Sequence, residues 1–329
     1  MTADPVATPT DARRIVVVGV GVVGRRVSRL LGTTVEHTGH RLASMARLEP
    51  GAAATGEFGP GDVVVLATGA PHASTAAELA EVGASVVSVS DDLGDTRQLL
   101  ELDDHFRQSG ATLVVGAAMS PGLSGLLARH LSSRLAVVEE IHVAVHATAG
   151  PACARQHHRA LSGRAAGWHD GVWIERPAGS GRELCWFPEP VGAHDCYRAE
   201  LPDPLLLHRS HPDVIRISAR MSATRRDRLT ARLPMLRSPH PEGGVGALRV
   251  EVRGAAADGA REVVIAGTAE LVGTAAGATA TVFAEAAATD ELPTGVVVTS
   301  DPSLPTTRLL ERVQRRGIRL QEFTGVPQA

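Results

Sequence analysis

The sequence predicts an α/β fold in which a doubly wound parallel sheet carries an inserted α+β domain on a mainly antiparallel sheet. A glycine-spaced loop follows an apolar, β-branched segment at 14–18, as expected where a buried parallel strand leads into a helix. Short apolar segments then alternate with amphipathic segments of helix length up to residue 131, a pattern typical of βαβ units. Beyond residue 131 apolar and polar residues alternate, and Trp, Arg and His become frequent, which predicts a second domain.

The length of 329 residues exceeds one typical domain. We expect residues 1–12, which are polar and rich in Pro and Thr, to form a disordered leader. The dinucleotide-binding domain is predicted at 13–131 and the substrate and dimerisation domain at 132–270. Residues 271–329 should be a helical segment that returns to the first domain.

The first domain is predicted from its strands and helices in order. A strand at 14–18 leads through glycines into a helix whose apolar positions include Val27 and Leu31, with Gly32 as its stop. The remaining predicted elements are strands at 62–69, 84–92 and 111–118, helices at 72–83 and 96–110, and a Pro-Gly turn that leads into a helix within 119–131.

The second half of the chain predicts longer strands. Residues 137–150 alternate like a half-exposed strand, and 247–267 read as a hairpin with its turn near Asp258 and Gly259. The Ala-rich segment 271–288 predicts a helix, and an amphipathic helix is expected from residue 306.

Composition excludes several classes of function. The net charge of −3 gives no basic excess, so we expect no nucleic-acid partner. The chain has no apolar run of membrane-spanning length and no apolar segment typical of a secretory signal, so we expect a cytoplasmic protein.

The three cysteines form no CxxC pair, and no metal site is predicted. The sequence contains no lysine, which excludes Schiff-base and lysine acid-base catalysis.

The glycine loop is the most specific motif. Gly19, Gly21 and Gly24 form a GxGxxG between a predicted strand and a predicted helix, the context in which this pattern binds dinucleotides. The first glycine permits the tight turn, the second lets the pyrophosphate approach the backbone, and the third lets helix and strand pack closely. Together with Val22 and Val23 in the first helical turn, they are predicted to bind NADP or NAD in a Rossmann domain.

The ribose-binding position is ambiguous. An acid is expected about 20 residues further on, at the end of the second strand. Glu36 fits that role, which would favour NAD; alternatively the strand ends near Gly39 and Arg41 binds the 2′-phosphate of NADP. Both side chains would also suit solvated loop positions.

The ends of later strands supply further cofactor-facing positions, because the carboxyl ends of parallel strands share one edge of the sheet. Asp91 lies in one of these loops. The residues predicted there to bind the cofactor are Thr68, Gly69, Ala70, Ser90, Met119, Ser120 and Pro121.

The segments "VVVGVGVVGRRV", "VVLATGAPHAS", "VVSVSDD" and "LVVGAAMSPGLSGLLARHL" resemble the saccharopine dehydrogenase/reductase-like NAD(P)-binding proteins over residues 13–131. The resemblance implies a Rossmann domain, an inserted substrate and dimerisation domain, a homodimer, and in many members oxidoreduction at a C–N bond. Members that use a lysine acid or base differ from this chain, which has none.

The predicted chemistry of the second domain centres on residues 167–204, where reactive side chains lie among five aromatic ones, and a residue within 157–198 is expected to handle the proton. The catalytic candidates are His157, Asp170, Tyr197 and Arg198, with Arg182 and Arg198 as clamps for a substrate carboxylate. An arginine cluster at 222–234 would suit either an anion site or a solvated face. The function expected is an NAD(P)-dependent oxidoreductase acting on a small carboxylate- or amine-bearing substrate. The alternative is a non-catalytic nucleotide-binding or scaffolding protein.

Overall fold

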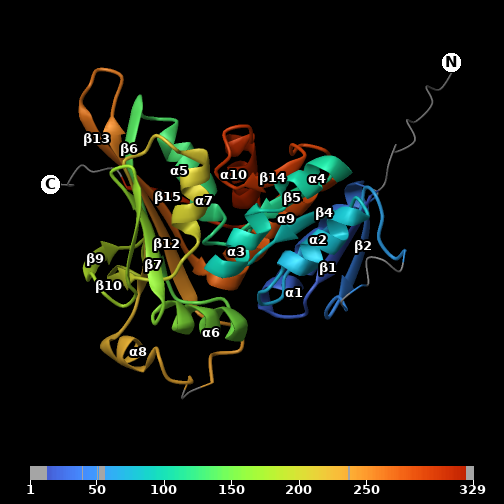
Figure 1. The fold of residues 1–329 in the computed structure, drawn as a ribbon, viewed down its shortest axis with the longest axis horizontal. Coiled ribbons are helices and arrows are strands. Elements are labelled where there is room, and N and C mark those ends of the chain that lie inside the picture. Colours follow the sequence, from blue (N-terminus) through green and yellow to red (C-terminus); the bar gives the residue numbers. More distant parts are fainter. Residues whose placement is uncertain (1–12, 39, 50, 52–55, 236–237, 324–329) are drawn as a thin grey trace.

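The computed structural model describes residues 13–323 apart from 39, 50, 52–55 and 236–237. It contains two sheets that lie beside each other, with helices between and around them (Figure 1). None of the helices that it describes combines the length and apolar character of a membrane span.

The first sheet is parallel and has six strands in the order β14-β5-β4-β3-β1-β2. The order reverses between β1 and β3, which pair from Ile15 with Val63 to Val18 with Leu66. In sheets of this kind, ligands bind at the carboxyl ends of the strands where the order reverses. The strands are β1 (Arg14–Val18), β2 (Arg41–Met45), β3 (Val63–Leu66), β4 (Ser85–Ser88), β5 (Thr112–Val115) and β14 (Gly295–Val298).

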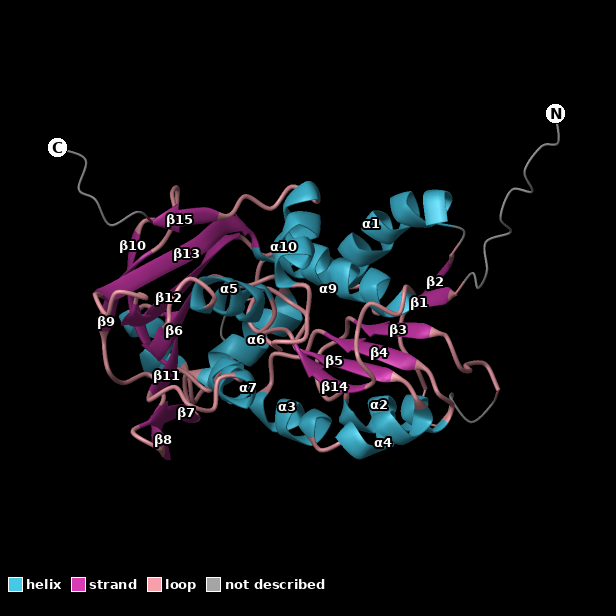
Figure 2. Cartoon of the chain, turned by 90° about the horizontal axis from the view of Figure 1, so that it is seen from above, coloured by secondary structure: helices cyan, strands magenta, loops and turns pink. Residues whose placement is uncertain are grey.

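Helices cover both faces of this sheet (Figure 2). One face packs against α1 (Val22–Thr38) and α9 (Val272–Ala288), and the other against α2 (Ala73–Glu81), α3 (Leu93–Leu100) and α4 (Asp103–Ser109). The expected single helix at 96–110 is therefore wrong, because a turn at 101–102 divides it.

Two further expectations about the boundaries are also wrong. Helix α1 does not stop at Gly32 but continues to Thr38, because its buried side chains pack along α9 and Thr34 Oγ1 donates a hydrogen bond to Glu285 Oε1 at 2.8 Å. Tertiary contacts here outweigh the poor helix propensity of glycine. The segment after α9, expected to be helical, also supplies strand β14 at the edge of the first sheet.

The second sheet is mixed but mainly antiparallel, as expected, with the order β15-β13-β12-β6-β11-β10-β9 and a β7-β8 hairpin that joins β11. Among the described strands of this sheet, only β6 and β11 pair in parallel. The predicted hairpin is confirmed as β12 and β13, with Gly259 at φ +83° in its turn. The strands are β6 (Val137–His146), β7 (Arg164–His169), β8 (Val172–Pro177), β9 (Glu183–Trp186), β10 (Ala193–Arg198), β11 (Arg216–Ser222), β12 (Val245–Ala255), β13 (Arg261–Leu271) and β15 (Gln321–Phe323).

One hydrophobic core joins the two sheets. It contains the α1 side of the parallel sheet, the inner face of the second sheet and nearly all of α9, of which only Thr274 is not buried. Helices α5 (Leu123–Ser132) and α10 (Thr306–Arg315) pack against each other beside α9. Helices α6 (Pro151–Ala160), α7 (Asp203–Ser210) and α8 (Arg225–Thr230) belong to the segment between β6 and β12.

Candidate active site

A cavity of about 530 Å³ lies where loops from both sheets meet. Its floor consists of the loops after β1, β3, β4 and β5, and its opposite wall consists of residues 149–159, which include most of α6. The cavity is therefore at the carboxyl ends of the parallel strands, beside the point where their order reverses.

The glycine loop has the geometry that the motif requires. Gly19 has φ +123°, and a Cβ atom there would lie 2.6 Å from the Ala67 carbonyl oxygen. A Cβ on Gly24 would lie 1.9 Å from the Gly19 carbonyl oxygen, so this glycine permits the close contact of helix and loop. Gly21 differs from both, because a Cβ there would meet nothing within 4 Å. Its free side faces the cavity, where an anionic group can approach the first turn of α1.

Most of the predicted cofactor-binding residues surround this cavity. Ser90 and Pro121 lie outside its lining, and so does Gly24, which packs against Gly19. Those that line it are Gly19, Gly21, Val22, Val23, Thr68, Gly69, Ala70, Met119 and Ser120.

Polar contacts beneath the cavity hold two of its loops. Thr68 Oγ1 lies 3.1 Å from His72 Nε2, and His72 Nδ1 lies 2.9 Å from the buried Ser88 Oγ. In the loop after β5, Ser120 Oγ donates a hydrogen bond to Asp203 Oδ2 at 2.8 Å. These contacts fix the positions of both loops, so the loop atoms that face the cavity are ordered before a ligand binds.

The expectation that a strand ends near Glu36 or Gly39 is wrong. Glu36 lies in the last turn of α1, and Arg41 is the first residue of β2, at the end of the strand away from the cavity; Gly39 lies outside the described residues. The carboxyl end of β2 is instead followed by Ala46, which lines the cavity, and by Arg47, whose side chain is 76% exposed. No carboxylate occupies positions 45–47.

Three reactive side chains meet on the cavity wall. Asp91 follows β4, while Cys153 and His157 lie one turn apart on α6, and their possible ligand atoms are within 4.8 Å of one another. His157 Nε2 lies 3.8 Å from Asp91 Oδ2, and the two side chains are only 11% and 20% exposed. Of the predicted catalytic residues, His157 alone lies here.

Burial sets the protonation of this group. It raises the pKa of Asp91 to about 6, although a hydrogen bond from the Cys153 thiol opposes that rise. It raises the pKa of Cys153 well above its ordinary value, an effect that the charge of Asp91 strengthens. It lowers the pKa of His157 to about 4, so this imidazole is neutral at pH 7. His157 Nδ1 is buried and has no hydrogen-bond partner among the described residues.

The same three side chains are also metal-ligand types. Asp, Cys and His all bind Zn²⁺, and a catalytic zinc site commonly has three protein ligands. The sequence predicted no metal site because its residues are far apart, with 61 residues between Asp91 and Cys153. The structure brings them together, so the group could serve either as an acid-base site or as a metal site.

A second cavity of about 810 Å³ adjoins the first and shares His157 with it. It is rich in histidine: the His146 and His194 rings stack with their centroids 4.1 Å apart, and His158 and His240 also line it. Burial lowers the pKa of His146, and the neighbouring charge of His194 lowers it further. The two cavities therefore meet at His157.

Two solved structures share this architecture over nearly the whole chain. Saccharopine dehydrogenase (L-glutamate-forming) from Saccharomyces cerevisiae matches with a TM-score of 0.66 and 13% identity, covering 94% of this chain and 100% of the other. The homospermidine synthase from Legionella pneumophila in complex with NAD matches with a TM-score of 0.69 and 12% identity, covering 95% and 91%. This chain has the saccharopine dehydrogenase-like fold. A scan against protein-family models finds no match, and a search of curated proteins finds no relative.

Within this saccharopine dehydrogenase-like fold, the other predicted catalytic residues lie away from the cavity. Asp170 is in the β7-β8 turn, with φ +48°, and pairs with His169. Tyr197 is buried beneath the guanidinium of Arg228, which lies 4.1 Å from its ring centroid. Arg198 lines a third cavity on the second sheet. These three residues are close to His157 in the sequence because strands β7–β10 follow α6, but they do not share a site with it.

Sequence reasoning missed Cys153 as a site residue and placed Asp91 only in a cofactor-facing loop. The available signal was positional: Asp91 follows a predicted strand at the ligand-binding edge, as Thr68 and Ser120 do. Nothing in the local sequence indicates that α6 lies across that edge, because this contact depends on the path of the chain through the second sheet.

Proposed function

We propose that this protein is an NAD(P)-dependent oxidoreductase that acts on a small carboxylate-bearing substrate in the cavity beside α6. The observation that carries the proposal is the continuity of one cavity from the open side of Gly21 to Asp91, Cys153 and His157. A homospermidine synthase with the same fold was solved in complex with NAD, which supports a dinucleotide in this position.

The residues present fit a dinucleotide. The free side of Gly21 and the first turn of α1 suit the pyrophosphate, Ala46 lies where the adenosine ribose is expected, and Thr68 and Ser120 line the end near Asp91. When bound, the nicotinamide cofactor supplies or accepts a hydride.

The protein's own part is then to move the proton and orient the substrate. With a pKa of about 6, Asp91 is ionised at neutral pH yet close enough to it to exchange a proton efficiently. The Cys153 thiol remains protonated and orients the Asp91 carboxylate through its hydrogen bond. Neutral His157 can accept or donate a hydrogen bond at its unpartnered Nδ1.

A substrate carboxylate has two cations available. Arg155 and Arg159 lie one helical turn apart on α6, and both line the cavity. Arg159 donates a hydrogen bond to Gln156 Oε1 at 2.5 Å, whereas Arg155 has no partner among the described residues. Arginine forks bind carboxylates in a bidentate manner, so this pair favours a substrate that carries one.

The test has two stages. Calorimetric titration with NADPH and with NADH should show saturable binding of at least one of them. Turnover should then appear in a panel of keto acids, aldehydes and amino acids assayed by nicotinamide absorbance. The absence of heat with both nucleotides would refute the proposal, whereas binding without turnover across the panel would favour the non-catalytic alternative.

We further propose NADP as the preferred cofactor. The carboxyl end of β2, at positions 45–47, lacks the acid that binds the ribose of NAD, and Arg47, which pairs with Glu49 at 2.7 Å, lies beside that position. Arg47→Ser should therefore weaken NADPH binding about tenfold and leave NADH binding nearly unchanged, because only the 2′-phosphate loses a charged hydrogen bond. Arg41→Ser, with the same change of charge at the other end of β2, is the matched control. Equal losses for both nucleotides in Arg47→Ser would contradict the assignment.

A further inference from the structure

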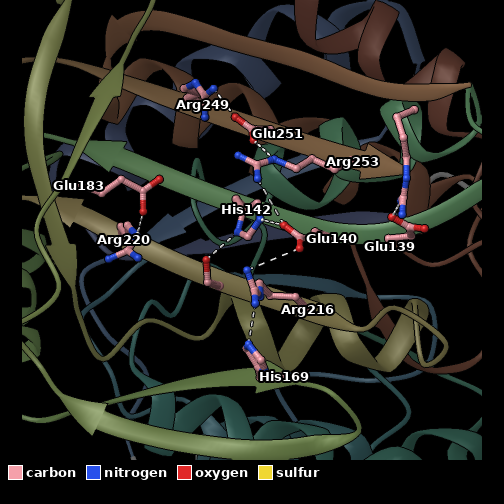
Figure 3. A network of polar contacts seen from close by, with 12 residues as sticks. Glu139, Glu140, His142, His169, Glu183, Arg216, Arg220, Arg249, Glu251 and Arg253 are labelled. Atoms are coloured by element: carbon pink, nitrogen blue, oxygen red, sulfur yellow. Dashed lines mark hydrogen bonds and ion pairs between the residues drawn. The ribbon is translucent and has the colours of Figure 1, made fainter. Parts of the chain in front are cut away.

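The outer face of the second sheet carries a dense network of charges on β6, β11 and β12 (Figure 3). Glu251, 7% exposed at its side chain, accepts hydrogen bonds from Arg249 and Arg253. Glu140 accepts a hydrogen bond from His142 Nε2 at 2.9 Å and lies 3.5 Å from the nearest nitrogens of Arg216 and of Arg253. Each of these two carboxylates is thus shared by more than one basic side chain.

A cavity of about 330 Å³ opens where this face meets strands β7, β8 and β10. It shares no lining residue with the two cavities beside His157. Five arginines line it and Glu183 is its one acidic residue among those described; the arginines are Arg176, Arg198, Arg216, Arg220 and Arg253.

The internal ion pairs leave two of these arginines uncompensated. Arg220 pairs with Glu183 at 2.7 Å, and Figure 3 shows this pair at one end of the network. Arg176 on β8 and Arg198 on β10 have no carboxylate or hydrogen-bond acceptor for their guanidinium groups among the described residues. Two cations therefore face a cavity already lined by positive charge.

The surroundings of Arg198 fit a group held ready for an anion. Its guanidinium lies close to Gly181, where a Cβ would be 1.9 Å from Nη1, and the φ of +63° at Gly181 favours glycine there. The Gly181 carbonyl oxygen accepts a hydrogen bond from Arg220, which brings the two guanidinium groups to the same turn. Burial lowers the pKa of Arg198, and the charges of Arg220 and Arg176 lower it further, whereas the charge of Glu183 raises it. Like charges held this close are stabilised by an anion between them.

We propose that this arginine-lined cavity binds a small, multiply charged oxyanion, a phosphate-bearing or polycarboxylate molecule, at a site separate from the cleft beside α6. The planar guanidinium forks of these five arginines, which lie on four strands, match the oxygen atoms of such groups, which they bind in a bidentate manner. The proposal does not depend on the proposed enzymatic activity.

Calorimetric titration at constant ionic strength tests the site with two probes, pyrophosphate and citrate. We expect saturable binding of at least one probe, and the probe that binds more tightly identifies phosphate or carboxylate as the preferred group. Arg198→Gln and Arg176→Gln should each weaken binding about tenfold, the effect of losing one charged hydrogen bond. Arg164→Gln is the matched control, because Arg164 lies on β7, pairs with Glu175 and does not line the cavity.

Pyrophosphate could also bind at the glycine loop, so the titrations are repeated with Gly21→Val, which fills that position. Binding that persists in Gly21→Val and is lost on adding Arg176→Gln and Arg198→Gln supports the proposal. Binding that is unchanged in the arginine variants would overturn it, as would the absence of heat with both probes. If the face instead meets a second copy of the chain, the variants would change the sedimentation coefficient without any anion binding, which would also overturn it.

Discussion

Replacing Gly21 with valine is expected to abolish nucleotide binding while leaving the protein folded. A Cβ at this position would meet no protein atom within 4 Å, so the native structure accommodates it. The added side chain would point into the cavity, where the pyrophosphate must approach the backbone. We expect the dissociation constant for NADPH to rise about a hundredfold or more, since the backbone hydrogen bonds to a charged group are lost. Calorimetry measures the affinity, and thermal unfolding of the free protein measures the fold.

Two glycines of α1, the helix that follows Gly21, serve as controls. Gly24→Val should lower the melting temperature strongly, because its Cβ would lie 1.9 Å from the Gly19 carbonyl oxygen. Gly32→Val should affect nucleotide binding little, since a Cβ there meets nothing within 4 Å and Gly32 does not line the cavity. Normal NADPH affinity in a folded Gly21→Val variant would rule out the glycine loop as the pyrophosphate site.

The second large effect is expected for Asp91→Asn, which should lower turnover by a factor of about 10² to 10⁴, the usual contribution of a general acid or base. Asparagine keeps an acceptor for the Cys153 thiol but cannot take up a proton. In the unmodified protein, kcat/KM should change with an apparent pKa near 6, the value that burial gives to Asp91. Asp170→Asn is the control, since Asp170 lies on an exposed turn away from the cavity. Unchanged turnover in Asp91→Asn would remove Asp91 from the proton transfer.

The same substitution should stabilise the fold at pH 7.5. Because folding raises the pKa of Asp91 from 3.8 to about 6, its ionised form is disfavoured in the folded state. Its contribution to stability is full below pH 3.8 and is lost as the pH rises through 6, by about 1–3 kcal/mol. His157 acts in the opposite direction, because its lowered pKa costs stability as the pH falls from 6.5 towards 4. Thermal unfolding of Asp91→Asn should therefore show a gain at pH 7.5 that shrinks below pH 6. A gain in stability with a loss of activity is typical of a functional site.

How well the sequence predicted each part depends on how local its cause is. The glycine loop was predictable because the turn, the close packing and the open position each follow from one short segment. The parallel sheet was predictable from repeated apolar segments. Strand β14 is as short as β3, β4 and β5, but it lies beyond the second domain, far along the chain from its partner β5, so no repeated pattern indicated it. The ribose position was misplaced because the contact of α1 with α9 extends the helix beyond Gly32.

The reactive group was only partly predictable for the same reason. His157 was predicted to be catalytic from its imidazole side chain. Its partners were not grouped with it, because Asp91 follows strand β4 and Cys153 lies at the start of α6. Asp170, Tyr197 and Arg198 were grouped with it because they are close in sequence. Alternation in a sheet sends neighbouring residues to opposite faces, so proximity along a strand is a poor guide to a shared site.

The burial of α9 also determines how the protein unfolds. All but one of its seventeen residues are buried, many of them in the core cluster that joins the two sheets, and Glu285 pairs with Arg316 in the segment after α10. Loss of α9 would therefore uncover one face of each sheet, although α2, α3 and α4 would still cover the other face of the parallel sheet. We therefore expect one cooperative thermal transition in which the calorimetric and van't Hoff enthalpies agree, rather than two separate domain meltings. Two resolved transitions would show that the shared helix does not couple the sheets.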